Sequence, residues 1–380
     1  MSKVLSFDRQ INISEKLFRD RVWRAFLDAL TQKQDLILDF RNVKFIVNTA
    51  VTKLCCLGEI AKKRGINVEI IPSEKIAKYF AEMDFWNIAA MNNIFTFDER
   101  YLYWPIDEKR VTNALFCLEK ESLKHKYYET FEFIGKVDEC DQYKHWVKAE
   151  LTGVNNTIYN GSYTIENIPK QCKAVLKTVS GFFGYSDYTA EDKILDSIIE
   201  LVHNAIWHSQ GKCYFFVQRS EYKVEPRREG INISVSDTGC GLYQSLVNKN
   251  DNLSYFNKDD FIMLANRSEQ NYYSIIEALF YRKKPGIRGL YNIITDLVDD
   301  HRHHFRELHL INGNVTFDLR EGLKENEKGV LYEMHDMSNL INKGIEVIIK
   351  ENKKCFSEIP DVGFSFCVDM GISIPKKGKG

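Results

Sequence analysis

The sequence carries almost no net charge, because 52 Lys and Arg residues stand against 53 Asp and Glu residues, a balance of -1 at pH 7. Such a chain lacks the overall electrostatic attraction with which basic proteins bind nucleic acid or an anionic membrane surface. It also lacks an apolar run long enough to cross a bilayer and a signal peptide at its start. We therefore expect a cytoplasmic protein, with neither a membrane nor nucleic acid as a partner.

The nine cysteines contain no Cys-x-x-Cys pair, and only Cys55 and Cys56 are neighbours. This spacing excludes the common zinc-site patterns and a disulfide framework, so we expect reduced, structural thiols. Internal repeats and low-complexity segments are also absent. With 44% hydrophobic and 28% charged residues, the 380-residue chain has the composition of a globular protein of roughly two or three domains.

The segment from Glu191 to His208 contains neither Gly nor Pro and predicts a long helix. Its apolar residues recur with helical periodicity and form a wide face suited to burial. These residues are Ile194, Leu195, Ile198, Ile199, Leu201, Val202, Ala205 and Ile206. Glu200, Asn204 and His208 share another face, where a carboxylate and a carboxamide one turn apart can bind one small ligand. A solvated polar stripe on an amphipathic helix has the same pattern.

A strand is predicted from Ile231 to Asp237, because apolar and small polar residues alternate along it. Asp237 ends the strand, and Gly239 and Gly241 follow it. Glycine permits positive φ and a close approach of the main chain to a flat ligand. A carboxylate before such a turn can accept a hydrogen bond from an exocyclic amine, although an Asp-Gly turn is also common on protein surfaces.

A third segment, Lys283 to Leu290, is punctuated by glycine and precedes a stretch that predicts a helix from Tyr291 to Val298. Backbone amides at a helix N-terminus bind phosphate oxygens, and Lys284 and Arg288 would add positive charge there. A Gly-x-x-Gly spacing is frequent by chance, so this segment gains meaning only beside the other two.

The order and spacing of these segments resemble the GHKL ATP-binding family of gyrase-type, heat-shock-chaperone, histidine-kinase and mismatch-repair ATPases. Residues 200–208 resemble its asparagine box, residues 237–241 its first glycine box and residues 286–290 its second. The resemblance covers roughly residues 165–340. It implies a Bergerat-type α/β sandwich with helices on one face of a mixed sheet, and a mobile lid over residues 242–285.

The resemblance also implies a site for ATP and Mg2+. Glu200 would be the catalytic base or would orient the nucleophile. The side-chain oxygen of Asn204 would be the single protein ligand of Mg2+. Asp237 would accept a hydrogen bond from the adenine amine. The other nucleotide-binding residues implied are Asn204, His208, Gly239, Gly241, Lys284, Gly286, Arg288, Gly289 and Leu290.

The first hundred residues alternate between predicted strands and helices, which favours a sheet covered by helices. Strands are expected at Asp35–Phe40, Asn67–Ile71 and Ile94–Phe97, and helices at Ala50–Arg64 and Glu74–Met83, with Ser73 as the second helix's cap. This α/β pattern resembles a STAS domain, the small fold of anti-sigma-factor antagonists and transporter tails. The resembling residues are 38–46, the helix up to 63–65, 76–80 and 94–97.

The loop before the first of these helices departs from the Asp-Ser-Ser-Gly pattern of phosphorylatable STAS domains. Asn48 replaces the usual acceptor serine, and Thr49 keeps a hydroxyl beside it. We interpret Thr49 as an N-terminal helix cap. The resemblance implies that the STAS-like domain binds a protein partner.

We expect a STAS-like domain at residues 1–100, a connector or accessory segment at 101–165, the GHKL domain at 166–340, and C-terminal strands with a basic tail at 341–380. Several smaller predictions accompany this division. They are a helix at Val111–Lys126, a weak strand at Glu129–Val137, a strand at Cys213–Arg219 paired with Ile231–Asp237, a helix at Tyr272–Tyr281 and a strand at Leu308–Ile311. Gly329–Met334 and Gly363–Val368 are both candidates for a last glycine box, and His301–His304 is interpreted as a solvated turn, not a metal site.

Three functions remain open from the sequence. The first is a GHKL ATPase or serine/threonine kinase in signalling. The second is an ATP-gated clamp that dimerises through its lid and hydrolyses ATP slowly, and the third is a non-catalytic nucleotide-sensing adaptor. A histidine kinase fits least, because Trp207 stands where those kinases usually carry a basic residue. A homodimer is expected.

Overall fold

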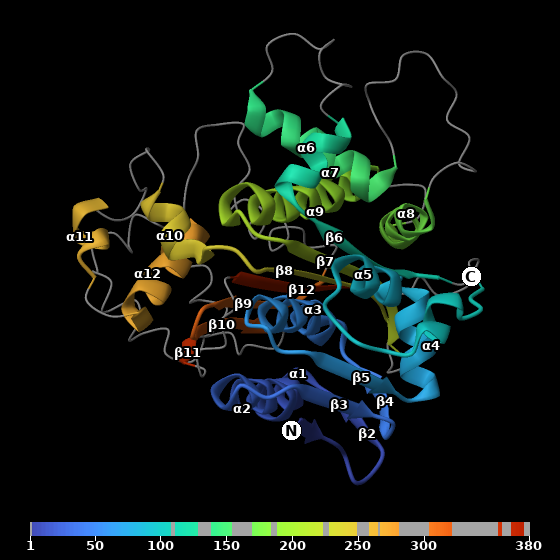
Figure 1. The fold of residues 1–380 in the computed structure, drawn as a ribbon. Helices are drawn as coiled ribbons and strands as arrows, with labels where there is room; N and C mark the ends of the chain where they lie inside the picture. The colour runs from blue at the N-terminus through green and yellow to red at the C-terminus, as the bar shows by residue number, and fades with distance from the viewer. Residues whose placement is uncertain are drawn as a thin grey trace.

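The computed structural model describes residues 2–107, 111–127, 138–153, 169–183, 188–222, 228–248, 258–264, 267–280, 304–320, 356–358 and 366–375. Within these ranges the protein is mixed α/β, as predicted. One large core lies in the N-terminal unit, residues 2–107, and another lies between the largest sheet and the helices above it (Figure 1).

A seven-stranded sheet, in the order β11-β10-β9-β12-β8-β7-β6, forms the centre of the molecule (Figure 1). Its strands are β6 (Asn113–Leu118), β7 (Cys213–Tyr222), β8 (Arg228–Asp237), β9 (His304–Asn312), β10 (Val315–Arg320), β11 (Phe356–Glu358) and β12 (Phe366–Pro375). The predicted pairing of β7 with β8 is confirmed. Every described pair is antiparallel, so the expectation of a mixed sheet is wrong for these strands. The connector supplies β6 and the C-terminal segment supplies β11 and β12.

Both faces of this sheet are covered. Helices α7 (Glu139–Thr152), α8 (Lys170–Phe183) and α9 (Tyr188–Ser209) lie over one face, with α6 (Lys120–Tyr127) against α7. Helix α3 (Asn48–Lys63) of the N-terminal unit crosses the opposite face (Figure 1). Alternate residues of β7 show the same division, because Phe215 packs in the core beneath α7–α9 and Phe216 packs in the N-terminal core.

The N-terminal unit contains two small parallel sheets, β1-β3-β5 and β2-β4. Its elements are β1 (Lys3–Leu5), β2 (Ile11–Ile13), α1 (Glu15–Leu17), the π-helical η1 (Phe18–Trp23), α2 (Arg24–Gln32), β3 (Leu36–Phe40), β4 (Val43–Ile46), α3, β5 (Val68–Pro72), α4 (Glu74–Glu82), α5 (Phe85–Asn92) and the 3-10 helix η2 (Glu99–Tyr103). The predictions for β3, α3, β5 and α4 are confirmed. The strand predicted at Ile94–Phe97 is reduced to a single parallel bridge between Thr96 and Glu69.

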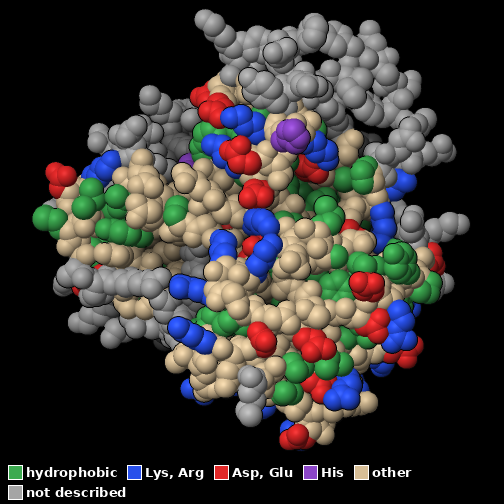
Figure 2. Space-filling view, viewed as in Figure 1, with side chains coloured by type: hydrophobic (Ala, Val, Ile, Leu, Met, Phe, Trp, Pro, Cys, Tyr) green, Lys and Arg blue, Asp and Glu red, His purple; other side chains and the backbone are tan. Residues whose placement is uncertain are grey.

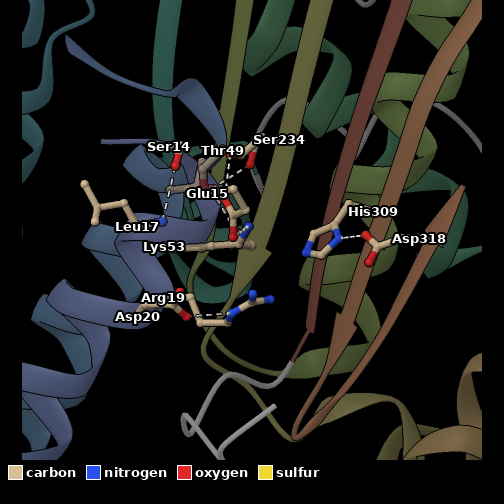
Figure 3. Close-up of polar contacts among 12 residues, drawn as sticks. Ser14, Glu15, Leu17, Arg19, Asp20, Thr49, Lys53, Ser234, His309 and Asp318 are labelled. Carbon is tan, nitrogen blue, oxygen red and sulfur yellow. Dashed lines mark hydrogen bonds and ion pairs between the residues drawn. The ribbon is translucent and has the colours of Figure 1, made fainter. Parts of the chain in front are cut away.

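Two predicted helix caps have opposite outcomes. The Ser73 side chain accepts a hydrogen bond from the Ile76 amide at 3.2 Å, as predicted. The cap prediction for Thr49 is wrong, because Thr49 lies inside α3, which begins after Val47 without a side-chain cap. Its hydroxyl instead donates to a carboxylate oxygen of Glu15 at 2.7 Å (Figure 3). A carboxylate from a distant helix outcompetes the local backbone.

The helix predicted over Val111–Lys126 is wrong in its first half. Asn113–Leu118 is strand β6, which pairs with β7, and only the later residues form α6. Buried Ala114 and Leu118 each lie two residues from Phe116 and pack beneath the helices, so tertiary pairing overrides the local helical pattern. The strand predicted at Glu129–Val137 lies outside the described residues.

Three helices follow the turn at the end of β8. They are α10 (Gly241–Val247), α11 (Lys258–Ile262) and α12 (Arg267–Phe280), and α12 confirms the helix predicted near Tyr272. They stand together at one end of the sheet (Figure 1). A small apolar cluster around Leu246 and Phe261 joins α10 to α11.

The face shown in Figure 2 carries both acidic and basic side chains. Several Lys and Arg side chains gather near its centre. A search of the described helices found none that combines the length and the apolarity needed to cross a membrane.

Candidate functional site

Helix α9 carries the first pair of candidate residues. Glu200 and Asn204 lie one turn apart, and the Asn204 side-chain amide donates a hydrogen bond of 3.3 Å to Oε1 of Glu200. This bond uses the amide nitrogen of Asn204. The amide oxygen is therefore the end of the side chain that a cation would bind. Glu200 orients Asn204 for that role.

Glu200 is buried, with only 4% of its surface exposed, because α7 lies over this face of α9. Lys144 of α7 forms an ion pair with it, with 2.8 Å between Nζ and Oε2. Both carboxylate oxygens of Glu200 therefore have a partner. The alternative reading of a solvated polar stripe is wrong at this residue.

A second contact between α9 and the helices above it involves Trp207. The Lys120 ammonium lies 3.9 Å from the centroid of one Trp207 ring, and the Tyr143 ring lies 5.3 Å from Trp207. A cation at this distance is attracted by the negative face of the ring. Trp207 thus holds a cation from α6 against α9.

Asp237 ends β8 between Cys213 of β7 and Phe366 of β12, and only 1% of it is exposed. Burial raises the pKa of Asp237 to about 7, although hydrogen bonds from the Gly239 amide and the Ser209 hydroxyl favour the charged form. The charge of such a carboxyl depends on what approaches it. A ligand amine that donates to Asp237 would favour the ionised carboxylate.

The turn after Asp237 packs against the C-terminal end of α9. The Cys240 amide donates to the Ser209 carbonyl at 2.8 Å. A Cβ on Gly239 would lie 2.0 Å from the same carbonyl oxygen, so a larger residue does not fit. Gly241 has a φ of +77°, where glycine is strongly preferred. Glycine is required at both positions, but at Gly239 the close neighbour is α9, where we expected a ligand ring.

Thr238 lies between Asp237 and Gly239. Its hydroxyl is buried without a hydrogen-bond partner among the described residues. Its amide donates to the Lys212 carbonyl at 3.1 Å. A buried hydroxyl without a partner is costly, so a polar ligand that bonds to it would be stabilised. Asp237 thus offers a hydrogen-bond acceptor, and Thr238 beside it offers a hydroxyl that has no partner in the described part of the chain.

The prediction of a Mg2+ site rests on Asn204 alone. Asn204 offers a neutral amide oxygen, which is a donor type that Mg2+ accepts alongside phosphate oxygens and water. The described part of the chain contains no group of three or more His, Cys, Asp or Glu side chains placed to hold a metal. His304 begins β9, whereas residues 301–303 lie outside the described residues.

The structure brings two of the three predicted segments together. The end of α9 contacts the Asp237 turn through Ser209 and through the His208 carbonyl, which accepts from the Cys240 thiol at 3.4 Å. The predicted phosphate-binding residues lie outside the described residues. They are Lys284, Gly286, Arg288, Gly289 and Leu290. Gly329–Met334 also lies outside them, whereas Phe366–Val368 begins β12.

Sequence reasoning missed Lys144, Ser209, Thr238 and Lys212. Lys144 comes from the segment expected as a connector, where no motif marks it. Gly211 follows Ser209 closely in the sequence, but its role shows only in the structure, where a Cβ on Gly211 would lie 2.4 Å from the Gly239 amide. Two glycine-containing turns that pack together are visible only once α9 and β8 are placed.

Comparison of this chain with family models, with curated proteins and with solved structures found no match in any of the three. Function must therefore be argued from the residues and their geometry. The most informative residues for function are those of the buried Asp237 turn and the Glu200–Asn204 pair of α9.

Proposed function

We propose that this protein is a GHKL-type ATP-binding enzyme that joins a STAS-like N-terminal domain to a Bergerat-type ATP domain. It binds Mg-ATP beside α9 and the Asp237 turn and acts as an ATPase or a serine/threonine kinase in cytoplasmic signalling. The observation that carries the proposal is Asp237, a buried carboxyl beside an unpartnered Thr238 hydroxyl. The adenine amine supplies the donor that would hold Asp237 in its ionised form.

The chain's own residues have distinct tasks in this proposal. Asp237 and Thr238 select the base, and Asn204 presents its amide oxygen to the metal while Glu200 holds its amide nitrogen. Bound Mg2+ would neutralise charge on the phosphates. Glu200 would orient a water or a Ser/Thr hydroxyl for attack. Phosphate binding by Lys284, Gly286, Arg288, Gly289 and Leu290 is proposed from the resemblance alone.

One contact favours a non-catalytic nucleotide-sensing adaptor as the second candidate. Both oxygens of Glu200 are already engaged, one by Asn204 and one by Lys144. A nucleophile would therefore have to compete with Asn204 and Lys144 for the oxygens of this carboxylate until Lys144 withdraws. If the ion pair persists with nucleotide bound, ATP would be sensed without being turned over.

A different observation favours the ATP-gated dimerising clamp. Ile262 and Met263 lie in the segment expected as the lid, and they are 45% and 72% exposed. Exposed apolar residues of this kind often mark a surface that another protein covers. The homodimer we propose would use this segment.

Incubation with γ-labelled ATP separates the candidates. Label on protein supports a kinase, and free phosphate supports an ATPase. ATP-dependent dimerisation with slow release of phosphate supports the clamp, and binding with neither product supports the adaptor. Asn204→Ala should abolish Mg-ATP binding, and wild-type affinity in that variant would contradict the site assignment.

The proposed protein partner would bind the N-terminal unit on a surface other than α3. Residues of α3 such as Val51, Leu54 and Cys55 are fully buried against the rest of the protein. A partner that needs this face would first have to displace the sheet.

A further inference from the structure

Lys212 connects the N-terminal unit to the Asp237 turn. It lies between the end of α9 and the start of β7, and its side chain reaches the N-terminal unit. Nζ donates to Oε1 of Glu59 in α3 and to the side-chain oxygen of Asn92 in α5, both at 2.8 Å. Its backbone carbonyl accepts from the Thr238 amide at 3.1 Å. One residue therefore bonds to both parts.

The N-terminal end of this connection is buried. The Glu59 side chain is 4% exposed, and the Tyr214 hydroxyl donates to the same Oε1 atom at 3.0 Å. An ion pair in such a place is weak evidence for stability by itself. Removing only the Lys212 charge, however, leaves a buried carboxylate without its cation, which strongly favours any rearrangement that brings water to Glu59.

The turn end is close-packed. Gly211, next to Lys212, leaves no space beside Gly239, because an added Cβ would lie 2.4 Å from the Gly239 amide. Movement of the Lys212 backbone must therefore move residues 238 and 239. Those residues flank Asp237 and include the unpartnered Thr238 hydroxyl.

A second attachment holds α3 on the strand that ends in Asp237. The Thr52 hydroxyl of α3 bonds to the hydroxyls of Ser234 at 2.7 Å and Ser236 at 2.9 Å, and all three residues are fully buried. Helix α3 is thus fixed along β8 itself, with Glu59 nearer its C-terminal end. The N-terminal unit therefore contacts the sheet through Glu59 and through Thr52. The residues that bind them, in the loop before β7 and in β8, are both connected to the Asp237 turn.

We propose that Lys212 is a positioning residue through which docking of the N-terminal unit sets the geometry of the Asp237 turn. Loss of the Glu59–Lys212 pair loosens the turn, and anything that lifts α3 from the sheet has the same effect. The coupling is reciprocal, so a ligand on the turn also tightens the docking of α3. The identity of that ligand as ATP rests on the proposed function; the coupling within the chain does not.

The test compares two lysines that form ion pairs, Lys212, whose side chain is 21% exposed, and Lys53 of α3, whose side chain is 1% exposed. Lys212→Met removes the connection. Lys53→Met is the matched control, because Lys53 forms an ion pair of the same length, 2.8 Å, with Glu15 inside the N-terminal unit (Figure 3). Hydrogen exchange of the amides of residues 236–242 is measured on the full chain without nucleotide. Binding of a non-hydrolysable ATP analogue with Mg2+ is measured separately.

We expect Lys212→Met to speed exchange in the turn by about tenfold, as local opening becomes easier, and to weaken analogue binding by a similar factor. Lys53→Met should change neither, and Lys212→Arg should restore most of both. Equal exchange in Lys212→Met and Lys53→Met would overturn the coupling. If the wild-type chain does not bind the analogue, the proposed function fails, and the exchange result still decides the coupling.

A milder variant covers the case in which Lys212→Met does not fold. Glu59→Gln keeps the size of the side chain and an oxygen acceptor but removes the charge. It should speed exchange in the turn by about threefold, in proportion to a weakened charge-assisted hydrogen bond. Wild-type exchange in a folded Glu59→Gln protein would also overturn the coupling.

Discussion

The two faces of the seven-stranded sheet bury polar groups in different ways. On the α3 face, the Thr52 hydroxyl bonds to Ser234 and Ser236, and Glu59 pairs with Lys212. On the α9 side, β8 ends in a carboxyl with a raised pKa, and the hydroxyl beside it in Thr238 has no partner in the described residues. The paired groups hold two parts of the protein together, whereas the hydroxyl without a partner at the turn could bond to a ligand.

The largest effect is expected from Asp237→Asn, which tests whether the turn on the α9 side binds a ligand. The amide has almost the same shape but presents a donor where the adenine amine needs an acceptor. ATP affinity should fall by about 100-fold or more, because a site built to bond one group rejects the mismatched pairing. Calorimetric titration with Mg-ATP measures this. Undiminished affinity would show that Asp237 does not contact the base.

The next largest effect is expected at Glu200. Glu200→Gln keeps the hydrogen bond from Asn204 but removes a group that can take a proton, so turnover should fall by about 10²- to 10³-fold with affinity nearly unchanged. Steady-state release of labelled phosphate is the measurement. Asp196→Asn, one turn earlier on α9, serves as the control with no expected loss. Equal turnover in Glu200→Gln and wild type would assign the base elsewhere.

On the opposite face, Thr52→Val should destabilise the protein by about 1–3 kcal/mol, because it removes the buried hydrogen bonds that the Thr52 hydroxyl forms with the Ser234 and Ser236 hydroxyls. Urea unfolding measures the change. Adding Ser234→Ala and Ser236→Ala should recover part of the loss, since it removes the hydroxyls whose bonds to Thr52 are lost. A triple variant less stable than Thr52→Val would argue that the hydroxyls are not a structural set.

A further expected effect is the pH dependence of stability. The folded-state pKa of Asp237 is about 7, above its ordinary value of 3.8, because of burial. The folded protein therefore keeps a proton that the unfolded chain releases, so this contribution is complete below about pH 4 and is lost as pH rises to about 7. Thermal unfolding from pH 4 to 8 should show it. Asp237→Asn should flatten the curve and raise the melting temperature most at the alkaline end.

The contrast between the faces also explains how far the sequence could lead. The helix through Glu200 and Asn204 and the strand into Asp237 were predictable, because apolar periodicity and glycine spacing are local signals. The packing of α7 over Glu200 was not predictable, because Lys144 is an ordinary lysine in a segment without a motif. The prediction that Thr49 caps a helix was wrong for a similar reason, since its partner Glu15 lies far away in the chain.

Local signals also explain why two strands of the sheet were predicted and a third was not. Strands β7 and β8 were predicted from the alternation of apolar and polar residues. β6 was mistaken for a helix because Asn113–Leu118 is apolar on more than one side, and only its pairing with β7 makes it a strand. The order of the sheet, in which β12 lies between β8 and β9, joins segments more than fifty residues apart and has no local signal.

We propose above all that the Asp237 carboxylate accepts a hydrogen bond from the adenine amine. This can be tested on the wild-type protein, without a substitution. Inosine triphosphate has the same sugar and phosphates but an oxygen in place of that amine. With Mg2+ at pH 8, ATP should bind at least about tenfold more tightly than inosine triphosphate, since only ATP donates to the carboxylate. Equal affinity for the two nucleotides would contradict the account.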